Sequence, residues 1–385
     1  MGNLIFKYFF VLLVFLNPVS SFAQTVIPLS KPKAFKGVNL YGARITGVGG
    51  TILITNGDNL YAIGKKNSKV RQYDFLRGIV NTSTNIATNF GKIIGLEQSN
   101  NLLLFNSMEI GINHIYLADY NSKRLLNAIH HPHIRFFEIT PDSEIIISGL
   151  HFTKYYEYLR KYDTNDFSRR KETDKAFNHL YSNYSGYYLA KYNTDLELID
   201  STMFVRTDAA TAEAIDYLST YVSPPIEIFD NQILTINPIE NNRIEFYTSQ
   251  FEKVKTLEVD FPEFKGFPRH LTEDKVNRMF NIPGSFSYWQ GVIAFGDTII
   301  AVFSHFKEKK QCQYSMFLSN GKKLADGIVP GEIIRLDSQL YLLNSSTVQR
   351  PVLKDITNFY LVPISVSELV EGAVTKDYVR RLING

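Results

Sequence analysis

The sequence predicts an all-β protein, a six-bladed β-propeller with helical and loop insertions on one face. Three observations support this prediction. A turn that contains Asp or Asn, followed by an apolar strand, recurs six times, and most of these hairpins are followed by a second hairpin. The chain also has a single cysteine, so a packed core must supply its stability. A propeller meets that requirement while leaving only short, protected sheet edges.

The N-terminus has the pattern of a secretory signal peptide, residues 1–23. Lys7 precedes the apolar run 8–16, and small residues precede a cleavage site after Ala23. The run is too short for a comfortable membrane span, although an uncleaved anchor is the alternative interpretation. We therefore expect an exported chain of residues 24–385, folded as a single domain without a transmembrane segment. Its expected location is the periplasm, the cell surface or the medium.

The composition limits the classes of partner. The formal net charge is +3, which is too balanced to suggest nucleic acid or an anionic membrane as the main partner. With Cys312 alone, no intrachain disulfide is possible, and this thiol is expected to be a buried, small apolar group. The remaining alternatives are a protein, a glycan or another small molecule. Oligomeric state is left open.

Six short apolar runs begin the repeating units, and each is joined to another strand by a tight turn. The first runs are TILIT, KIIGLE, RFFEIT, PIEIF, GVIAF and EIIRL. The second strands lie in the segments 57–64, 99–106, 141–149, 229–237, 296–303 and 336–344. Asn, Asp and Gly tolerate the backbone angles that such antiparallel hairpins need. In the first unit, TILITNGDNLYAIG fits either the first or the middle hairpin.

A second hairpin follows in most units, with an aromatic-rich strand, a polar turn and another strand. The clearest examples are 114–129, 187–200, 243–259 and 313–328, with 70–75 and 358–364 as candidate equivalents. The spacing of the units, about 40–45 residues, is typical of propeller blades. A tandem β-sandwich is the main alternative, but it does not predict so regular a unit. We expect residues 24–48 to include a strand that closes the ring against the last blade.

The C-terminal segment 365–385 departs from the repeat. Ser365 and Glu368 have capping-box spacing, and residues 377–383 have a helical pattern. The segment is interpreted as a structural cap under the last blade.

Three features are shared with a known group of proteins: Gln24 after the cleavage site, the six divergent hairpin units, and NFYLVPISVSEL (358–369) before a short tail. In these features the chain resembles the TolB-like six-bladed propellers of exported Bacteroidetes proteins. The resemblance implies a fold and an exported location, and it implies no particular activity.

Strand direction predicts where the insertions lie. In a blade of four antiparallel strands, the second-to-third loops and the crossings to the next blade share one face. The long segments, about 150–185, 207–225 and 262–289, all fall in such connections. Loops carried by a rigid scaffold are common binding sites, so we expect the site on this face. Helical patterns in 208–222 and 274–280 could form a lid or could simply fill space beside the blades.

The candidate binding residues come from these connections and their ends. Tyrosines offer stiff contact surface, and arginines can pair with carboxylate or phosphate. The alternative interpretation of the Tyr-rich stretch is a solvated basic loop. Trp289 is interpreted either as a core anchor or as a sugar-stacking platform. The candidates are His130, His131, His133, Arg135, Tyr155, Tyr156, Tyr158, Arg169, Arg170, Arg269, His270 and Trp289.

Motifs for catalysis or cofactors are not found in the sequence. It has no G-x-S-x-G, P-loop or G-x-G-x-x-G, and the histidines around HHPHIR (130–135) match no familiar metal spacing. No cofactor and no metal are predicted. The favoured function is binding without catalysis. The alternatives are a hydrolase or lyase with its active site over the central channel on the same face, and a structural subunit of a cell-envelope assembly.

Overall fold

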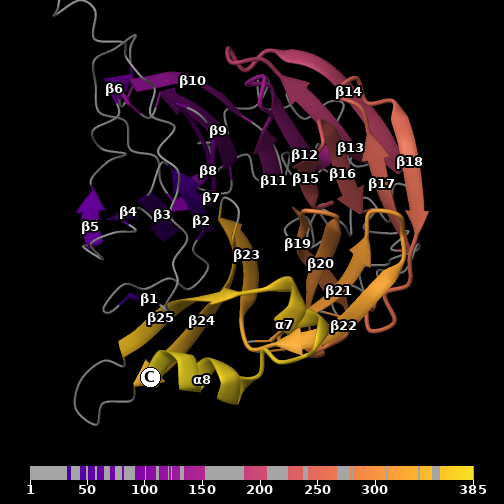
Figure 1. Ribbon diagram of the computed structural model, residues 1–385. Coiled ribbons are helices and arrows are strands. Elements are labelled where there is room, and N and C mark those ends of the chain that lie inside the picture. The colour runs from indigo at the N-terminus through magenta and orange to yellow at the C-terminus, as the bar shows by residue number, and fades with distance from the viewer. Residues whose placement is uncertain are drawn as a thin grey trace, which may run out of the picture.

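The computed structural model is an all-β propeller, with small sheets arranged around a common axis (Figure 1). The residues described are 33–35, 44–48, 51–56, 59–64, 70–73, 80–81, 92–99, 101–109, 112–119, 121–122, 124–130, 134–151, 186–205, 224–236, 242–266, 278–279, 281–308, 311–336, 339–348 and 356–384.

The sheets are numbered here in chain order. Sheet 1 has β2 (Arg44–Val48), β3 (Thr51–Asn56), β4 (Asn59–Gly64) and β5 (Val70–Tyr73). Sheet 2 has β7 (Lys92–Ser99), β8 (Leu102–Glu109), β9 (Ile112–Asp119) and β10 (Arg124–His130), with β6 (Val80–Asn81) on its outer edge. Sheet 3 has β11 (Ile134–Ile139), β12 (Ile145–His151), β13 (Gly186–Tyr192) and β14 (Leu198–Val205).

Three further sheets complete the ring. Sheet 4 has β15 (Ile226–Phe229), β16 (Gln232–Ile236), β17 (Arg243–Tyr247) and β18 (Lys253–Glu258). Sheet 5 has β19 (Ser287–Phe295), β20 (Thr298–His305), β21 (Cys312–Leu318) and β22 (Lys323–Val329). Sheet 6 has β23 (Glu332–Leu336), β24 (Gln339–Val348), β25 (Ile356–Ile364) and β1 (Lys33–Phe35).

The prediction of six four-stranded blades is wrong. Among the described strands, only five sheets have four, because sheet 2 has a fifth strand, β6, that pairs in parallel with β10. A two-residue strand carries too little apolar pattern to be recognised in a sequence. The hairpin TILITNGDNLYAIG is the middle one of sheet 1, since β2 precedes it and is the innermost strand.

The expected ring closure is confirmed. β1, from the N-terminal part of the chain, pairs antiparallel with β25 and supplies the outermost strand of sheet 6. Around the axis, β7 lies beside β2 and β11, β15 lies beside β11 and β19, and β19 lies beside β23. These six strands form the inner wall.

Antiparallel pairing divides the connections between two faces. Turns between the first and second strands of a sheet, and between the third and fourth, lie on one face, which we call the turn face. Connections between the second and third strands, and between sheets, lie on the other, which we call the insertion face. Segments 152–185, 206–225 and 259–286 all begin and end there.

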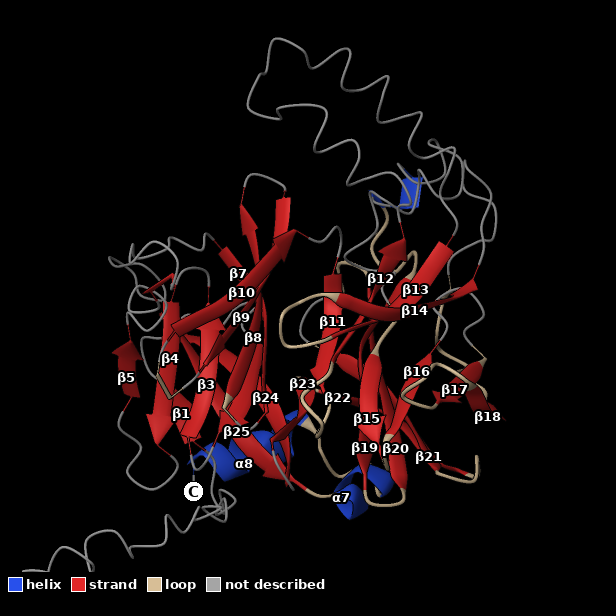
Figure 2. Ribbon diagram, turned by 90° about the horizontal axis from the view of Figure 1, so that it is seen from above, coloured by secondary structure: helices blue, strands red, loops and turns tan. Residues whose placement is uncertain are grey.

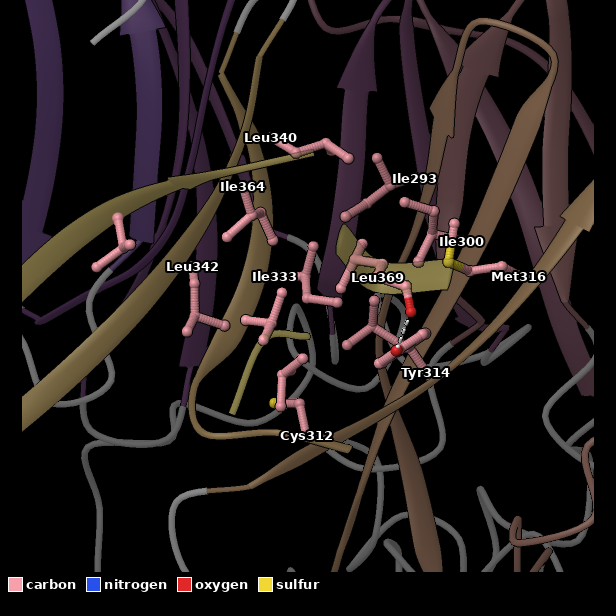
Figure 3. Packing of buried hydrophobic residues seen from close by; sticks show 14 of the residues in the cluster. Ile293, Ile300, Cys312, Tyr314, Met316, Ile333, Leu340, Leu342, Ile364 and Leu369 are labelled. Atoms are coloured by element: carbon pink, nitrogen blue, oxygen red, sulfur yellow. Dashed lines mark hydrogen bonds between the residues drawn. The ribbon is translucent and has the colours of Figure 1, made fainter. Parts of the chain in front are cut away.

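Apolar clusters fill the spaces between neighbouring sheets. Between sheets 5 and 6, Ile300, Met316 and Leu342 are buried in one such cluster (Figure 3). Cys312 belongs to this cluster, and burial raises the pKa of its thiol to about 12, so its expected role as a buried apolar group is confirmed. Because strands alternate their side chains, sheets 3, 4 and 5 each bury both of their faces, one against each neighbour.

In sheets 3, 4 and 5, the turn between the third and fourth strands packs against the preceding sheet. Leu196 and Phe251 hold positive φ angles of 58° and 60°, yet both are buried in the clusters beside that sheet. Such angles are unfavourable for bulky residues, so packing must offset the backbone strain. In sheet 5 the same position is Gly321, with φ of 90°, and a Cβ there would meet Leu257 of sheet 4 at 3.5 Å.

Side-chain donors also link neighbouring sheets on the turn face. In each case a side-chain nitrogen of one sheet donates to a backbone carbonyl in the third-to-fourth turn of the next. The pairs are Asn127 with Asp195, Lys191 with Ser249, and Lys255 with Ser319. These bonds satisfy carbonyls that the turn itself leaves without a strand partner.

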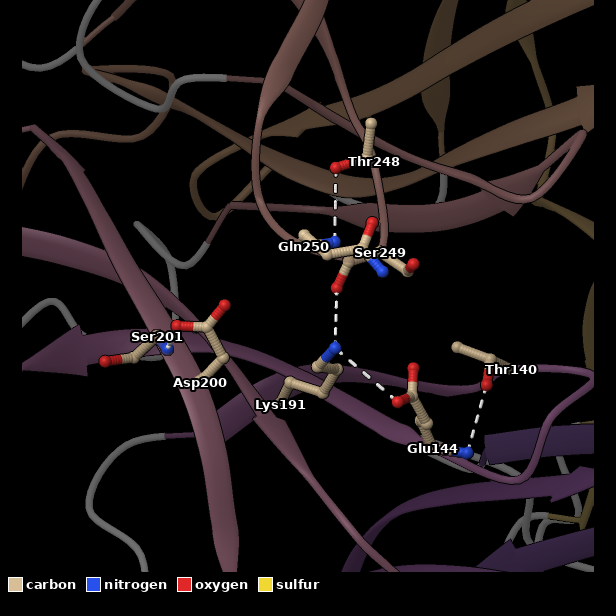
Figure 4. Close-up of polar contacts among 8 residues, drawn as sticks. All are labelled: Thr140, Glu144, Lys191, Asp200, Ser201, Thr248, Ser249 and Gln250. Carbon is tan, nitrogen blue, oxygen red and sulfur yellow. Dashed lines mark hydrogen bonds and ion pairs between the residues drawn. The ribbon is translucent and has the colours of Figure 1, made fainter.

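Lys191 is the most buried of these donors, at 6% exposed. Its Nζ lies 2.8 Å from the Ser249 carbonyl oxygen and 3.5 Å from Oε1 of Glu144 (Figure 4). Burying an ammonium group is unfavourable unless it is paired, and these two acceptors provide the pairing.

The C-terminal helices pack at the end of the sheets away from the insertion face (Figure 2). The capping box expected at Ser365 and Glu368 is present at the start of α7 (Val366–Val370). The α8 helix (Lys376–Asn384) follows, and its Val379 joins the cluster between sheets 5 and 6. The Tyr314 hydroxyl donates to the Leu369 carbonyl at 2.7 Å, which fixes α7 against sheet 5.

Candidate functional site

Most of the predicted site residues lie outside the described residues, so their placement stays a prediction. His130 ends β10 and Arg135 lies near the start of β11, which puts both backbones at the insertion-face end of their strands. The candidates outside the described ranges are His131, His133, Tyr155, Tyr156, Tyr158, Arg169, Arg170, Arg269 and His270.

Trp289 is described, and it is a core residue. It is 1% exposed, and its ring stacks on Phe264 with the centroids 4.2 Å apart. Phe261 and Phe303 meet its ring edge-on. Trp289 therefore offers no surface to a ligand. Instead it anchors the beginning of segment 259–286 to sheet 5.

Lys265, inside segment 259–286, is hydrogen-bonded to Ser287, the first residue of β19. The Lys265 N–H donates to Oγ of Ser287 at 2.8 Å, and the Ser287 N–H donates to the Lys265 carbonyl at 2.8 Å. The Lys265 ammonium group donates to the Gly284 carbonyl at 3.0 Å. The intervening chain therefore leaves and returns at one closed base.

His305 holds this base against sheet 5. Its Nδ1 lies 2.7 Å from Oγ of Ser287, and its Nε2 lies 2.5 Å from the side-chain amide of Gln313. Either neutral tautomer satisfies both contacts, provided that the Gln313 amide is oriented to match. Burial lowers the pKa of His305, with a contribution from Lys265, while Glu308 and Glu263 act in the opposite direction. At 7% exposed, this imidazole is neutral at physiological pH.

A cavity of about 130 Å³ lies beside this network, between sheet 5 and the start of segment 259–286. Gln313, which contacts His305, lines it together with Glu263, Phe303 and Ile328. Small-molecule sites have volumes of about 300 Å³ or more, so this cavity suits one side chain or functional group.

A second polar cluster lies on the innermost strands, toward the turn face. Arg335 of β23 donates through Nη2 to Oε1 of Glu227 on β15 at 2.6 Å, and through Nη1 to the Ala294 carbonyl on β19 at 2.9 Å. Glu227 is 5% exposed. Burial raises its pKa to about 7, although Arg335 and the N–H groups of Ala294 and Ile228 favour the charged form.

Glu138 of β11 belongs to the same cluster. Burial raises the pKa of Glu138 well above its usual range, the charges of Glu97 and Glu227 raise it further, and Arg335 acts against them. Glu138 and Arg335 each lie one residue from the end of their strand at the first turn of the sheet. The cluster is therefore at the opposite end of the inner wall from the insertions.

Sequence reasoning did not single out this cluster, although a signal was present. Each of the apolar runs KIIGLE, RFFEIT, PIEIF and EIIRL has a charged residue in the part nearer its first turn. These residues are Glu97, Glu138, Glu227 and Arg335. In GVIAF the corresponding part is apolar, and there the Ala294 backbone makes the contacts. A charged side chain on an otherwise buried strand needs a polar or charged partner. Four such residues on the first strands of different units could therefore have predicted a cluster around the axis.

No group of three or more His, Cys, Asp or Glu side chains in the described ranges is arranged to hold a metal ion. None of the helices in those ranges has the length and apolar character that a membrane crossing requires.

Comparisons with known proteins add little to this picture. No protein-family model matches the chain, and no curated protein matches it. Among solved structures, a Bacteroides fragilis protein described as exported has 11% identity and a TM-score of 0.46, covering 88% of this chain and 97% of that one. The WD40 β-propeller domain of Doa1 has 8% identity and a TM-score of 0.41, covering 82% and 77%.

A chain of the mitotic checkpoint complex is similar at the same level, with 9% identity and a TM-score of 0.43, covering 86% of this chain and 92% of that one. Similarities this low show neither a common family nor a common function. Membership of the TolB-like propellers therefore stays a prediction.

Proposed function

We propose that the protein is an exported β-propeller that binds a protein, glycan or other small-molecule ligand through its insertion face. The signal-peptide pattern of residues 1–23 supports export. Propellers commonly use one face of the disc for recognition, because the scaffold positions loops without needing them for its core.

One observation carries the choice of face. On the turn face, short connections contribute to packing. Leu196 and Phe251 are buried side chains of such turns, and Lys191 donates a hydrogen bond to the backbone of another. On the insertion face, segment 259–286 is closed at its base by its own hydrogen bonds and by His305. A loop anchored at its base can present its remaining residues to a partner with little ordering cost.

The cavity beside Gln313 adds a second support. It lies at the foot of the same segment and fits a single side chain or functional group of a ligand. The cluster of carboxyl groups with raised pKa values lies at the other end of the axis, so it lends no support to an active site at the insertion end.

The test begins with a thermal-shift screen of the mature chain against glycans, metal ions and peptides. Any compound that stabilises the protein is then tested on a variant in which 152–185 is replaced by a short hairpin turn. His151 and Gly186 are directly paired across β12 and β13, so a short turn can join these strands without altering the sheet.

We expect the variant to keep its melting temperature and to bind at least about tenfold more weakly, a loss of 1.4 kcal/mol or more. The matched control is Glu252→Gln, an exposed side chain on the turn face. Unchanged binding by the shortened variant, or equal losses in both variants, would remove segment 152–185 from the site.

A further inference from the structure

The cavity beside sheet 5 combines apolar walls with two carboxylates. Pro262, Phe303 and Ile328 supply apolar surface, and Glu263 and Asp326 are the charged residues of its lining. Ile328 is 58% exposed although it borders a hollow of about 130 Å³. An occupant that fills the hollow and covers Ile328 removes apolar surface from water, which favours an occupant with an aliphatic part.

The two carboxylates differ in their partners. Oδ1 of Asp326 accepts a hydrogen bond from Oγ of Ser315 at 2.7 Å, and Oδ2 lies 2.6 Å from Nζ of Lys323. Within the described ranges, the carboxylate of Glu263 has neither a hydrogen bond nor an ion pair. Lys265, close to it in the chain, directs its ammonium group to a backbone carbonyl instead. The exposed carboxylate of Glu263 is therefore available to a cation from outside.

The cavity is connected to the base of segment 259–286. Glu263 belongs to that segment, and Gln313 lines the cavity while its side-chain amide lies 2.5 Å from Nε2 of His305. His305 in turn contacts Oγ of Ser287 at 2.7 Å. A partner that places a side chain in the cavity therefore lies directly beside this segment, and the two can act as one recognition surface.

We propose that the cavity binds a lysine or arginine side chain of a protein partner. Both side chains combine an aliphatic stem with a terminal cation. The stem packs against Phe303 and Ile328, and the cation pairs with Glu263. An acidic side chain would be repelled by Glu263 and Asp326, and an uncharged aliphatic one would leave Glu263 unpaired. This inference rests on the proposed function, because it names the kind of partner that the insertion face recognises.

The test uses NMR of the mature protein with isotope-labelled isoleucine methyl groups. The Ile328 resonance is assigned from an Ile328→Val variant, and the protein is titrated with N-acetyl-lysine methylamide and with its arginine and norleucine analogues. We expect the Ile328 methyl to shift, and the lysine and arginine probes to bind about fivefold more tightly than uncharged norleucine, as one exposed ion pair allows. The methyl of Ile333, buried between sheets 5 and 6, should not shift.

Glu263→Gln tests the carboxylate itself, and it retains the size of an exposed side chain. We expect this variant to bind the lysine probe about fivefold more weakly than wild type does, with unchanged binding of the norleucine probe because the cavity is intact. Glu252→Gln is the matched control, since that exposed carboxylate lies on the turn face. The proposal is overturned if no probe shifts Ile328, if the lysine and norleucine probes bind equally, or if Glu263→Gln loses no affinity.

The variant with 152–185 replaced by a short turn separates this inference from the proposed function. It keeps the cavity, so it should bind the lysine probe as wild type does. If a compound from the screen needs 152–185 while Glu263→Gln binds the lysine probe normally, this inference alone fails. If the lysine probe behaves as expected while no compound needs 152–185, the role proposed for that segment fails and this inference stands.

Discussion

The two faces of the disc use their connections in different ways. On the turn face, the third-to-fourth turns of sheets 3, 4 and 5 pack against the preceding sheet and accept hydrogen bonds from it. On the insertion face, long segments leave the sheets, and the base of one of them, 259–286, is fixed by contacts among Lys265, Ser287 and His305. The difference indicates that one face maintains the ring while the other is available for recognition.

The faces also differ in their electrostatics. Near the turn face, the carboxyl cluster favours protonated groups, so its contribution to stability is lost as the pH rises. Near the insertion face, His305 has a lowered pKa and favours its neutral form. Its contribution is therefore lost as the pH falls below about 6.5, the usual value for histidine.

The largest expected effect concerns the anchor of the insertion face. Replacing Trp289 by Ala removes a fully buried ring that packs on Phe264 and Phe303. We expect a loss of about 4 kcal/mol in the free energy of unfolding, measured with denaturant. Val254→Ala, at a 51% exposed position, serves as the control. A loss below about 1 kcal/mol would show that the base of segment 259–286 is not part of the core.

The next effect concerns the bridge across the axis. Arg335→Met leaves the buried carboxyl group of Glu227 without its guanidinium partner. We expect a loss of about 2 kcal/mol at pH 7, less than for a fully buried pair, because the Arg335 side chain is 35% exposed. Combining this change with Glu227→Gln should restore part of the loss in a double-mutant cycle. Simple additivity of the two changes would contradict direct coupling.

A smaller effect tests the turn face alone. Gly321→Ala places a Cβ at a φ of 90°, where L-residues are strained. We expect thermal unfolding to report a loss of about 1 kcal/mol. Gly291→Ala is the matched control, because a Cβ there would meet nothing within 4 Å. Equal effects of the two substitutions would show that the turn can relax, contrary to the rigidity argued for this face.

The smallest expected effect is a change in how stability depends on pH. His305→Gln keeps a polar side chain beside Ser287 and Gln313 but removes the imidazole that takes up a proton. We expect the variant to lose less stability than wild type between pH 7 and pH 5, because the neutral imidazole no longer has to compete with protonation in the unfolded chain. If the free energy of unfolding falls equally in wild type and variant between pH 7 and pH 5, the lowered pKa of His305 is contradicted.

Much of the fold was predictable because hairpins are local. The turns at 230–231 and 296–297 contain Asp, Asn or Gly, and the structure has hairpins at both places. Two strands escaped this reasoning for the same physical reason. β6 has two residues and β1 has three, and runs this short show no periodicity. The position of β1 was nevertheless inferred, since a ring needs closure.

The candidate site was less predictable, because its contacts join residues far apart in the sequence. Arg335 and Glu227 are 108 residues apart, and only the order of the inner strands brings them together. Trp289 could be interpreted as a core residue from its place at a strand start, but its aromatic partners could not be identified. His305 carried no sequence signal, because its partners Ser287 and Gln313 are ordinary polar residues in neighbouring strands.

The pairing of β1 with β25 also constrains the order of events during folding. A sheet that needs both the first and the last of the described strands cannot be completed while the chain is still emerging from a ribosome or an export channel. Until then β25 has an open edge, available to any extended segment nearby. A bulky tag fused just before residue 33 would hinder the pairing of β1 with β25. It would therefore slow the completion of folding more than the same tag placed after α8.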